Sequence, residues 1–332
     1  MIRKIPIKDM NKAEWLEERS KSIGGSEIGA VLGLNPFQSA YALWLERTGK
    51  APAFEGNLAT DVGTALEAFV AERFAKVTGF GARVMNSYFL YRNDKYPHLH
   101  ASPDRLIHET VGTKSAVFAG LECKTTSEWN TKKFKGIEFP VQYYAQCVQY
   151  MMVLNCYEWY LAVLVGNREF HIYRLLRGVE TLTDHPDWLD GQIIVDNDDI
   201  NALAEAAEDF WQKIELNIAP VPDGSKSSTD ALNEQWPESF DHEIDLSFRS
   251  QEIEELLALK EKKKEIEARA AEIENIIKAE MGDSERARVG DHKISWKSST
   301  SSSFDSKAFK AACPDLAAQY SKPSTTRRFL VK

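Results

Sequence analysis

The chain has 332 residues, a hydrophobic content of 43% and a formal net charge of −9. This length suits one large domain or two, and no segment reaches the roughly 20 consecutive apolar residues that span a membrane. The N-terminal MIRKIPIKDM lacks the apolar core of a signal peptide, so we expect a cytoplasmic protein. The acidic total excludes a surface that is basic throughout but allows a local basic groove.

A glycine-rich approach to a helix lies near the N-terminus. Trp15 and Leu16 belong to a predicted short helix that ends near Arg19, and Ser26, just after Gly25, is a suitable N-cap for the next helix. Free backbone N–H groups at a helix start favour anions, and a guanidinium fork suits phosphate. The pattern therefore predicts either an anion site closed by Arg19 or an ordinary capped helix.

Residues 61–75 have the apolar spacing of an amphipathic helix. Its apolar positions are Val62, Ala65, Leu66, Phe69, Val70 and Phe74. Glu67 lies in the N-terminal half of this helix. If the helix packs beside the strands that follow, the Glu67 carboxylate can join a metal site there. A solvated helix glutamate is the alternative interpretation.

Two short predicted strands carry a split acidic signature. The first follows Asp104, and the second contains Glu122, Cys123 and Lys124. Because strand side chains alternate, Glu122 and Lys124 face one way and Cys123 faces the core. A hairpin would bring Asp104 beside this pair, where two carboxylates can hold a hard divalent cation and a lysine can orient water or stabilise phosphate charge. A plain hairpin with a surface Glu–Lys pair remains the alternative.

The segment after these strands contains a basic cluster and an apolar helix. Lys132 and Lys133 can supply part of a basic groove, or they belong to a solvated loop. Residues 141–154 suit a largely buried helix on which Gln146 and Tyr150 share one face. A buried glutamine needs hydrogen-bond partners. An active-site water, a metal-bound carboxylate or a phosphate would each satisfy Gln146.

The remaining elements indicate a mixed α/β core followed by an appendage. We predict domains at 1–222 and 251–332, joined by a linker over 223–250. Strands near 159–165 and 169–173 and a helix near 200–216 complete the core. The appendage is predicted to contain a charged helix at 251–281 with Gly282 as its C-cap, a strand at 287–296, a short helix at 305–312 and a strand at 327–331.

A series of short motifs follows one order along the first two thirds of the chain. They are Arg19, IGGSEI at 23–28, GLNPF at 33–37, YxLW at 41–44, GTxxE at 63–67, SPD at 102–104, LECK at 121–124 and QxxxY at 146–150. This series resembles the YqaJ viral recombinase group of phage-type alkaline exonucleases. The resemblance implies a PD-(D/E)xK restriction-endonuclease-like core, an α/β fold with a central mixed sheet flanked by helices, here followed by a small α+β C-terminal appendage.

The resemblance also implies an activity and its catalytic residues. Such enzymes are Mg²⁺-dependent deoxyribonucleases that degrade one strand of linear duplex DNA from 5′ to 3′. Two ions are expected, with Mn²⁺ as the alternative metal. By motif position, the metal ligands are Asp104, Glu122, Glu67 and the backbone carbonyl of Cys123, and Lys124 positions or activates water. Gln146 and Tyr150 complete the catalytic set.

The substrate and partners are likewise implied by the resemblance. Arg19, Ser26 and Ser102 would form the pocket for the 5′-phosphate, with Lys132 and Lys133 as further DNA contacts. The 3′ tails would pass to a single-strand annealing protein, and a ring-shaped homotrimer in the host cell of a phage or prophage is the expected assembly. A PD-(D/E)xK nuclease of other polarity, an endonuclease, and a non-catalytic binding module on a nuclease fold remain the competing hypotheses.

Overall fold

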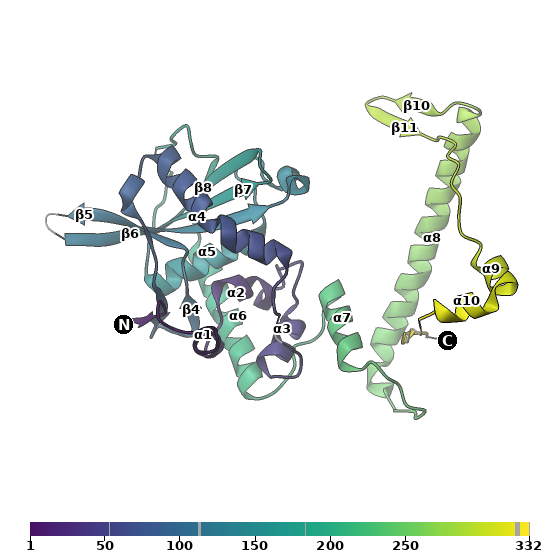
Figure 1. Ribbon diagram of the computed structural model, residues 1–332, viewed down its shortest axis with the longest axis horizontal. Coiled ribbons are helices and arrows are strands. Elements are labelled where there is room, and N and C mark those ends of the chain that lie inside the picture. Colours follow the sequence, from purple (N-terminus) through teal and green to yellow (C-terminus); the bar gives the residue numbers. More distant parts are fainter. Residues whose placement is uncertain (53, 112–113, 183, 323–325, 332) are drawn as a thin grey trace. The chain divides into compact units, whose positions relative to one another are not determined.

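The computed structural model describes residues 1–52, 54–111, 114–182, 184–322 and 326–331, in two compact units, Met1–Gln235 and Trp236–Lys332 (Figure 1). A six-stranded mixed sheet of order β2-β5-β6-β7-β8-β9 forms the centre of the first unit, as predicted. Its strands are β2 (Val84–Asn86), β5 (Arg105–Val111), β6 (Lys114–Thr126), β7 (Glu158–Val165), β8 (Glu169–Arg177) and β9 (Gly191–Val195).

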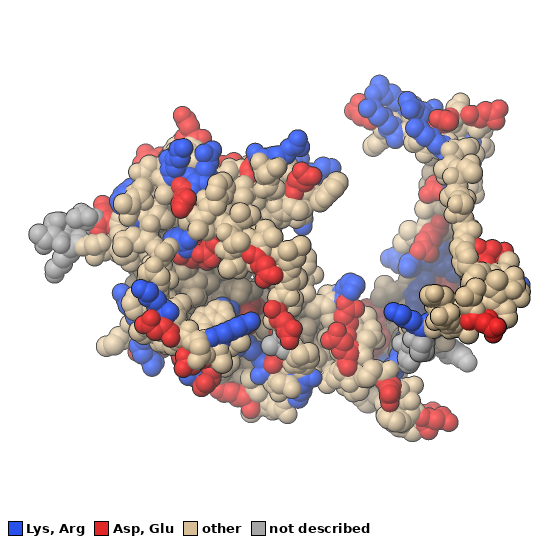
Figure 2. Space-filling model, viewed as in Figure 1, with Lys and Arg blue, Asp and Glu red and all other residues tan. Residues whose placement is uncertain are grey.

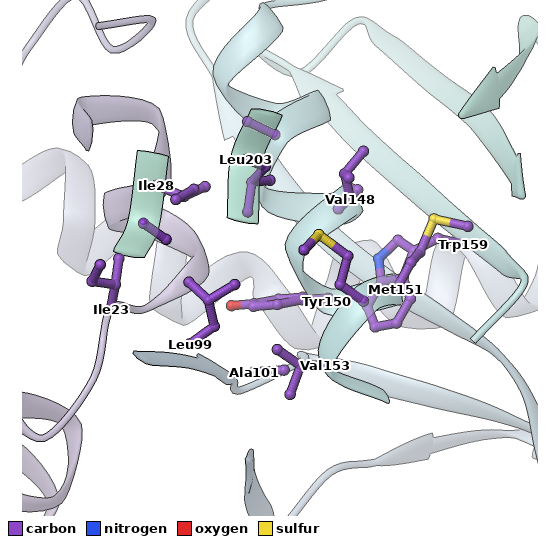
Figure 3. Close-up of a cluster of buried hydrophobic side chains, with 14 of the residues drawn as sticks. Ile23, Ile28, Leu99, Ala101, Val148, Tyr150, Met151, Val153, Trp159 and Leu203 are labelled. Atoms are coloured by element: carbon purple, nitrogen blue, oxygen red, sulfur yellow. The ribbon is translucent and has the colours of Figure 1, made fainter. Parts of the chain in front are cut away.

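Helices cover both faces of this sheet because the side chains of its central strands alternate. Tyr160 of β7 packs with Phe74 of α4 (Leu58–Thr78) on one face. Its neighbour Trp159 points to the other face, where α5 (Val141–Leu154) lies (Figure 3). Both faces of the central strands are therefore buried, which explains their nearly continuous apolar sequences.

The strand pairings of β6 set the geometry of the site. It pairs antiparallel with β5 in a register that places Arg105 opposite Leu121, and parallel with β7. A parallel pair needs a crossover connection, and α5 provides it. The pairing of β5 with β6 confirms the hairpin predicted from the split acidic signature.

The N-terminal helices, the small sheet β1-β3-β4 and helix α6 form a further layer against α5. An isolated pairing of Ile23 with Leu99 joins the N-terminal helices to the small sheet, and Figure 3 shows both side chains in the same buried cluster as Tyr150. The elements of this layer are α1 (Lys12–Ser20), α2 (Gly25–Val31), α3 (Ala40–Arg47), β1 (Ile2–Pro6), β3 (Phe89–Asn93), β4 (Tyr96–Ala101) and α6 (Asn197–Glu215). Two short 3₁₀ helices, η1 (Gly81–Arg83) and η2 (Glu128–Lys133), complete the unit.

The stretch predicted as a linker contains helix α7 (Lys226–Gln235). This helix is held to the first unit by two hydrogen bonds: the Ser39 N–H donates to the Ser227 hydroxyl, and the Tyr41 hydroxyl donates to the side chain of Gln235. The polar composition that suggested a linker therefore belongs to a short helix, which also packs Ala231 and Leu232 against the hydrophobic core.

The second unit corrects two predicted strands. Residues 287–296 form a hairpin rather than one strand, because Gly290 adopts a positive φ of 56° between β10 (Arg286–Val289) and β11 (His292–Ser295). Residues 327–331 pair with no strand of the described chain. The predicted helices are confirmed as α8 (Ser250–Met281), with Gly282 as C-cap, and α9 (Ser306–Ala312); η3 (Ser247–Arg249) and α10 (Pro314–Gln319) accompany them.

Charge is mixed over the face of the first unit that Figure 2 shows, where Lys and Arg lie interspersed with Asp and Glu. Among the residues that the structure describes, no helix has both the length and the apolar character needed to cross a bilayer.

Candidate active site

The two predicted carboxylates meet at the start of β5 and the middle of β6. Asp104 Oδ2 accepts a hydrogen bond of 2.7 Å from the backbone N–H of Cys123. Glu122 is 3% exposed, and its Oε1 lies 2.8 Å from Nζ of Lys124. The Cys123 side chain is buried on the opposite face of the strand, with Val70 of α4. The alternation predicted for residues 122–124 is confirmed.

Strand β6 supplies the hydrogen-bond partner that the sequence required for the buried glutamine of helix α5. Gln146 Nε2 donates to Glu122 Oε1 at 2.5 Å and lies 3.2 Å from the Tyr150 hydroxyl. Lys124 Nζ also lies 5.5 Å from the ring centroid of Tyr143 on the same helix. The Glu122 carboxylate is thus held by Lys124 of its own strand and by Gln146 of α5, so its orientation is fixed before any ligand binds.

Burial raises the pKa values of both carboxyl groups. For Asp104, burial is the larger cause and the charge of Glu122 adds to it. For Glu122, burial raises the pKa and the Lys124 ammonium partly offsets it. Burial alone would lower the pKa of Lys124, but the charges of Glu122 and Asp104 outweigh it and raise that pKa. One lysine therefore balances two buried acids, and a second positive charge would relieve the remaining repulsion.

One oxygen of the Glu122 carboxylate is available to interact with such a charge. Glu122 Oε2 is buried and has no hydrogen-bond partner among the described residues. Mg²⁺ binds through one or two carboxylates and keeps several waters, so Asp104 and Glu122 fit a magnesium ion. Within the described chain no group of three His, Cys, Asp or Glu side chains could hold a metal, and the backbone carbonyl of Cys123 stays a predicted ligand.

Glu67 of α4 is close enough to influence both carboxylates electrostatically, but its own carboxylate is engaged. Oε1 of Glu67 forms an ion pair with Nη1 of Arg105, which also donates to the backbone carbonyl of Asp104. Arg105 thus ties the Glu67 helix to the start of β5. A direct metal contact by Glu67 stays a prediction, and it requires this ion pair to open.

Gly25 brings the N-terminal layer against the acidic centre. A Cβ atom at Gly25 would lie 2.3 Å from a ring carbon of Tyr150 and 3.0 Å from Cγ of Gln146. No side chain fits at such distances, so glycine is required for α2 to approach α5 this closely. The start of α2, next to Ser26, therefore packs directly against Gln146 and Tyr150, which belong to the predicted catalytic set.

The predicted anion pocket exists in part. Arg19 lies with its guanidinium carbon 4.6 Å from the Trp15 ring, and its Nη2 lies 3.4 Å from the Ser26 hydroxyl. The prediction that Ser26 caps α2 is wrong, because Gly24 is the N-cap and its N–H donates at 2.7 Å to the Glu27 carboxylate. That backbone N–H is consequently not available to an anion.

The predicted roles of Ser102, Lys132 and Lys133 depend on contacts with DNA, and within the described chain their side chains form no hydrogen bond or ion pair that bears on those roles. Ser102 follows β4 and is partly buried, whereas Lys132 and Lys133 are exposed on η2. Their assignments as phosphate or DNA contacts stay predictions.

Sequence reasoning missed His100, which is buried beside this pocket. Its Nδ1 lies 3.0 Å from the Ser22 hydroxyl, and its Nε2 has no hydrogen-bond partner in the described part of the chain. Burial, followed by the charge of Arg19, lowers the pKa of His100, so the imidazole is neutral at neutral pH. A signal existed only in three dimensions, because Ser22 and His100 are 78 residues apart.

The comparisons with known proteins extend over this same region. A family model, the YqaJ-like viral recombinase domain, matches residues 14–157. The protein YqaJ of Bacillus subtilis (strain 168) is 33% identical over 330 residues, which cover 98% of this chain and 95% of that protein. The chain belongs to the YqaJ-like viral recombinase family. The family match includes both the carboxylate centre and the Arg19 pocket, and the likeness to YqaJ continues through the second unit.

Other similarities are more limited. A protein of African swine fever virus is 34% identical over 105 residues, which are 30% of this chain and 28% of its own length. The alkaline exonuclease of Laribacter hongkongensis has a TM-score of 0.47 and 17% identity, covering 62% of this chain and 94% of its own. A phage-related exonuclease of Haemophilus somnus has a TM-score of 0.38 and 12% identity, covering 60% and 96%. Assignment to the recombinase family rests on the sequence match to YqaJ.

Proposed function

We propose that the protein is a metal-dependent deoxyribonuclease that degrades one strand of linear double-stranded DNA from its 5′ end. The observation that carries this proposal is the buried Glu122 carboxylate beside Lys124 and the half-buried Asp104, with one Glu122 oxygen left without a partner among the described residues. Buried carboxylates are costly unless a cation or hydrogen bonds compensate them. Membership in a viral recombinase family supports DNA as the substrate.

Each side chain of the centre has a distinct task. Bound divalent ions, Mg²⁺ or alternatively Mn²⁺, supply the charge that activates water and stabilises the departing oxygen. Asp104, Glu122 and the Cys123 carbonyl hold them. Gln146 fixes Glu122 through Oε1 and so leaves Oε2 directed to the ligand. Lys124, as an ammonium group, donates to the attacking water or to a non-bridging phosphate oxygen.

Polarity follows from where the end of the cut strand binds. Arg19 and Ser26, with Ser102, bind the terminal 5′-phosphate through charge-assisted hydrogen bonds. The contact between Gly25 and Tyr150 keeps that phosphate at a fixed distance from the carboxylates, so that the next phosphodiester lies at the metal. These contacts carry no sequence information, and we propose cleavage without base preference.

The product and assembly complete the proposal. Degradation from the 5′ end leaves a 3′ single-stranded tail, the substrate of a single-strand annealing protein. Lys132 and Lys133 lie on η2, directly after β6, where they can contact the DNA backbone. We propose a homotrimeric ring as the assembly that would keep the enzyme on its duplex.

Linear duplexes labelled at either the 5′ or the 3′ end test this function. Wild-type protein with Mg²⁺ should release 5′-end nucleotides first, and EDTA or Lys124→Ala should abolish release. A Lys263→Ala variant, altered on α8, serves as the matched control and should cleave normally. Nicking of closed circles without release from ends would instead favour an endonuclease. Wild-type protein that binds DNA but releases no nucleotides, with or without Mg²⁺, would favour a non-catalytic module.

A further inference from the structure

One aromatic side chain a few residues beyond Lys124 in the sequence is almost entirely uncovered. Trp129, on η2, is 88% exposed, the highest value among the aromatic side chains that the structure describes. A tryptophan normally buries most of its surface. Trp129 lies five residues beyond Lys124, so its Cα is at most about 17 Å from that of Lys124 even with the chain fully extended.

The segment that carries Trp129 is firmly anchored. Asn130 Nδ2 donates to Oγ1 of Thr126 at 2.8 Å, at the end of β6. Directly after η2, Phe134 is buried and stacks on His171 with the ring centroids 5.7 Å apart. Exposure of the indole is therefore a property of a fixed platform.

A basic side chain shares the face of the indole. In a 3₁₀ helix, residues three apart eclipse each other, so Trp129 and Lys132 project on the same side of η2. Lys133 follows directly, and neither lysine forms an ion pair within the described chain. An aromatic face with an adjacent free ammonium group is the combination that binds single-stranded nucleic acid, because the ring stacks on a base and the cation contacts a phosphate.

We propose that Trp129 and Lys132 form a stacking platform for a single-stranded DNA segment next to the carboxylate centre, with the indole under a base and the ammonium on the neighbouring phosphate. The identity of that strand, the one being separated at the cleavage site, rests on the proposed nuclease function. Binding at the platform does not, because it requires no metal and no cleavage.

Binding of a fluorescein-labelled single-stranded oligodeoxynucleotide to the full-length protein in EDTA tests the platform. Trp129→Ala should weaken binding by about 5- to 100-fold, the usual effect of losing one base–aromatic stack. Trp129→Phe, which keeps an aromatic ring, should recover much of that loss. Lys132→Gln should have a smaller effect and reduce the dependence of affinity on salt concentration.

Trp296→Ala is the matched control, since Trp296 is also an exposed tryptophan, at 47%, but lies in the second unit. The Trp296→Ala variant should bind the oligodeoxynucleotide with the same affinity as the wild type. Unchanged affinity in Trp129→Ala, or an equal loss in Trp296→Ala, would overturn the platform. Failure of the nuclease function would look different: no cleavage by wild-type protein, yet single-strand binding that still depends on Trp129.

Discussion

The carboxylate centre and the Arg19 pocket are neighbours joined at Gly25, but they are built in opposite ways. Glu122 is buried, and both Gln146 and Lys124 hold it in place. Arg19 is half-buried and Ser26 is exposed, and the only contact between them is the 3.4 Å approach of Arg19 Nη2 to the Ser26 hydroxyl within the described residues. The fold therefore holds the two carboxylates in place although they repel each other. The phosphate pocket, in contrast, is completed only when its ligand binds. Changes at the centre should alter chemistry and stability together, and changes at the pocket should alter recognition alone.

The largest effect should come from Gly25→Ala, which disturbs both regions at once. The new Cβ would lie 2.3 Å from the Tyr150 ring, and forcing such overpacking costs about 1–3 kcal/mol. We expect a lower melting temperature together with loss of both cleavage and preference for 5′-phosphorylated ends.

Gly63→Ala on α4 is the control for this change, because its Cβ would make an ordinary contact of 3.6 Å with Thr125. It should leave cleavage unchanged and stability equal or slightly higher, because alanine favours a helix interior over glycine by about 1 kcal/mol. Equal behaviour of the two alanine variants would show that the α2–α5 contact does not couple the regions.

Gln146→Ala should affect the centre alone. Without its amide, Glu122 Oε1 keeps Lys124 but loses Gln146, and loss of such orienting groups typically costs about 10- to 100-fold in metal affinity or activity. The expected result is a higher Mg²⁺ requirement with unchanged preference for 5′-phosphorylated ends. A Mg²⁺ titration of duplex cleavage measures the first, and a wild-type titration curve for the variant would count against the orienting role.

Arg19→Ala should affect the pocket alone. A charge-assisted hydrogen bond contributes about 1.5–3 kcal/mol, so we expect about a tenfold or larger rise in KM for 5′-phosphorylated duplexes. For 5′-hydroxyl duplexes KM should not change. Arg3→Ala, which removes an exposed arginine paired with Asp94 on the small sheet, is the control. Should wild-type protein use both kinds of end equally well, the pocket assignment is wrong.

The smallest effect concerns stability without metal. The folded-state pKa of Asp104 is raised above its ordinary value by burial and by Glu122, so stability that is present at low pH is lost as pH rises through that pKa. Asp104→Asn removes the charge and can still accept the hydrogen bond from Cys123. In EDTA the variant should therefore be more stable by about 1 kcal/mol, or about 2–4 °C.

The advantage of Asp104→Asn should grow as pH rises above the ordinary pKa range of an aspartate and reverse when Mg²⁺ is added. Thermal melts at a series of pH values, with and without Mg²⁺, provide the measurement. A variant less stable than wild type at every pH in EDTA would mean that repulsion at the centre is already compensated.

The sequence predicted those parts of the site that depend on local periodicity. Alternation along a strand placed Glu122, Cys123 and Lys124 correctly, and helical spacing placed Gln146 with Tyr150. The pairing of Glu67 with Arg105 was not predictable, since it depends on how α4 packs on the sheet. For the same reason, the predicted apolar face of that helix is only partly buried.

Competition between similar groups explains the wrong helix cap. Gly24 and Ser26 are both acceptable N-caps, and the choice was decided by the Glu27 carboxylate, which reaches back to the Gly24 N–H. Arg47 holds that carboxylate from α3, a tertiary contact without a signal in the local sequence.

The most direct test of the account is Mg²⁺-dependent cleavage of a linear 5′-phosphorylated duplex by Glu122→Gln. Glutamine keeps the shape of the side chain but removes the charge that would bind the metal, and Glu158→Gln, a change of the same kind on β7, is its control. The account predicts a folded Glu122→Gln variant that still binds DNA but no longer releases nucleotides, beside a control that does. Wild-type cleavage by Glu122→Gln would contradict it.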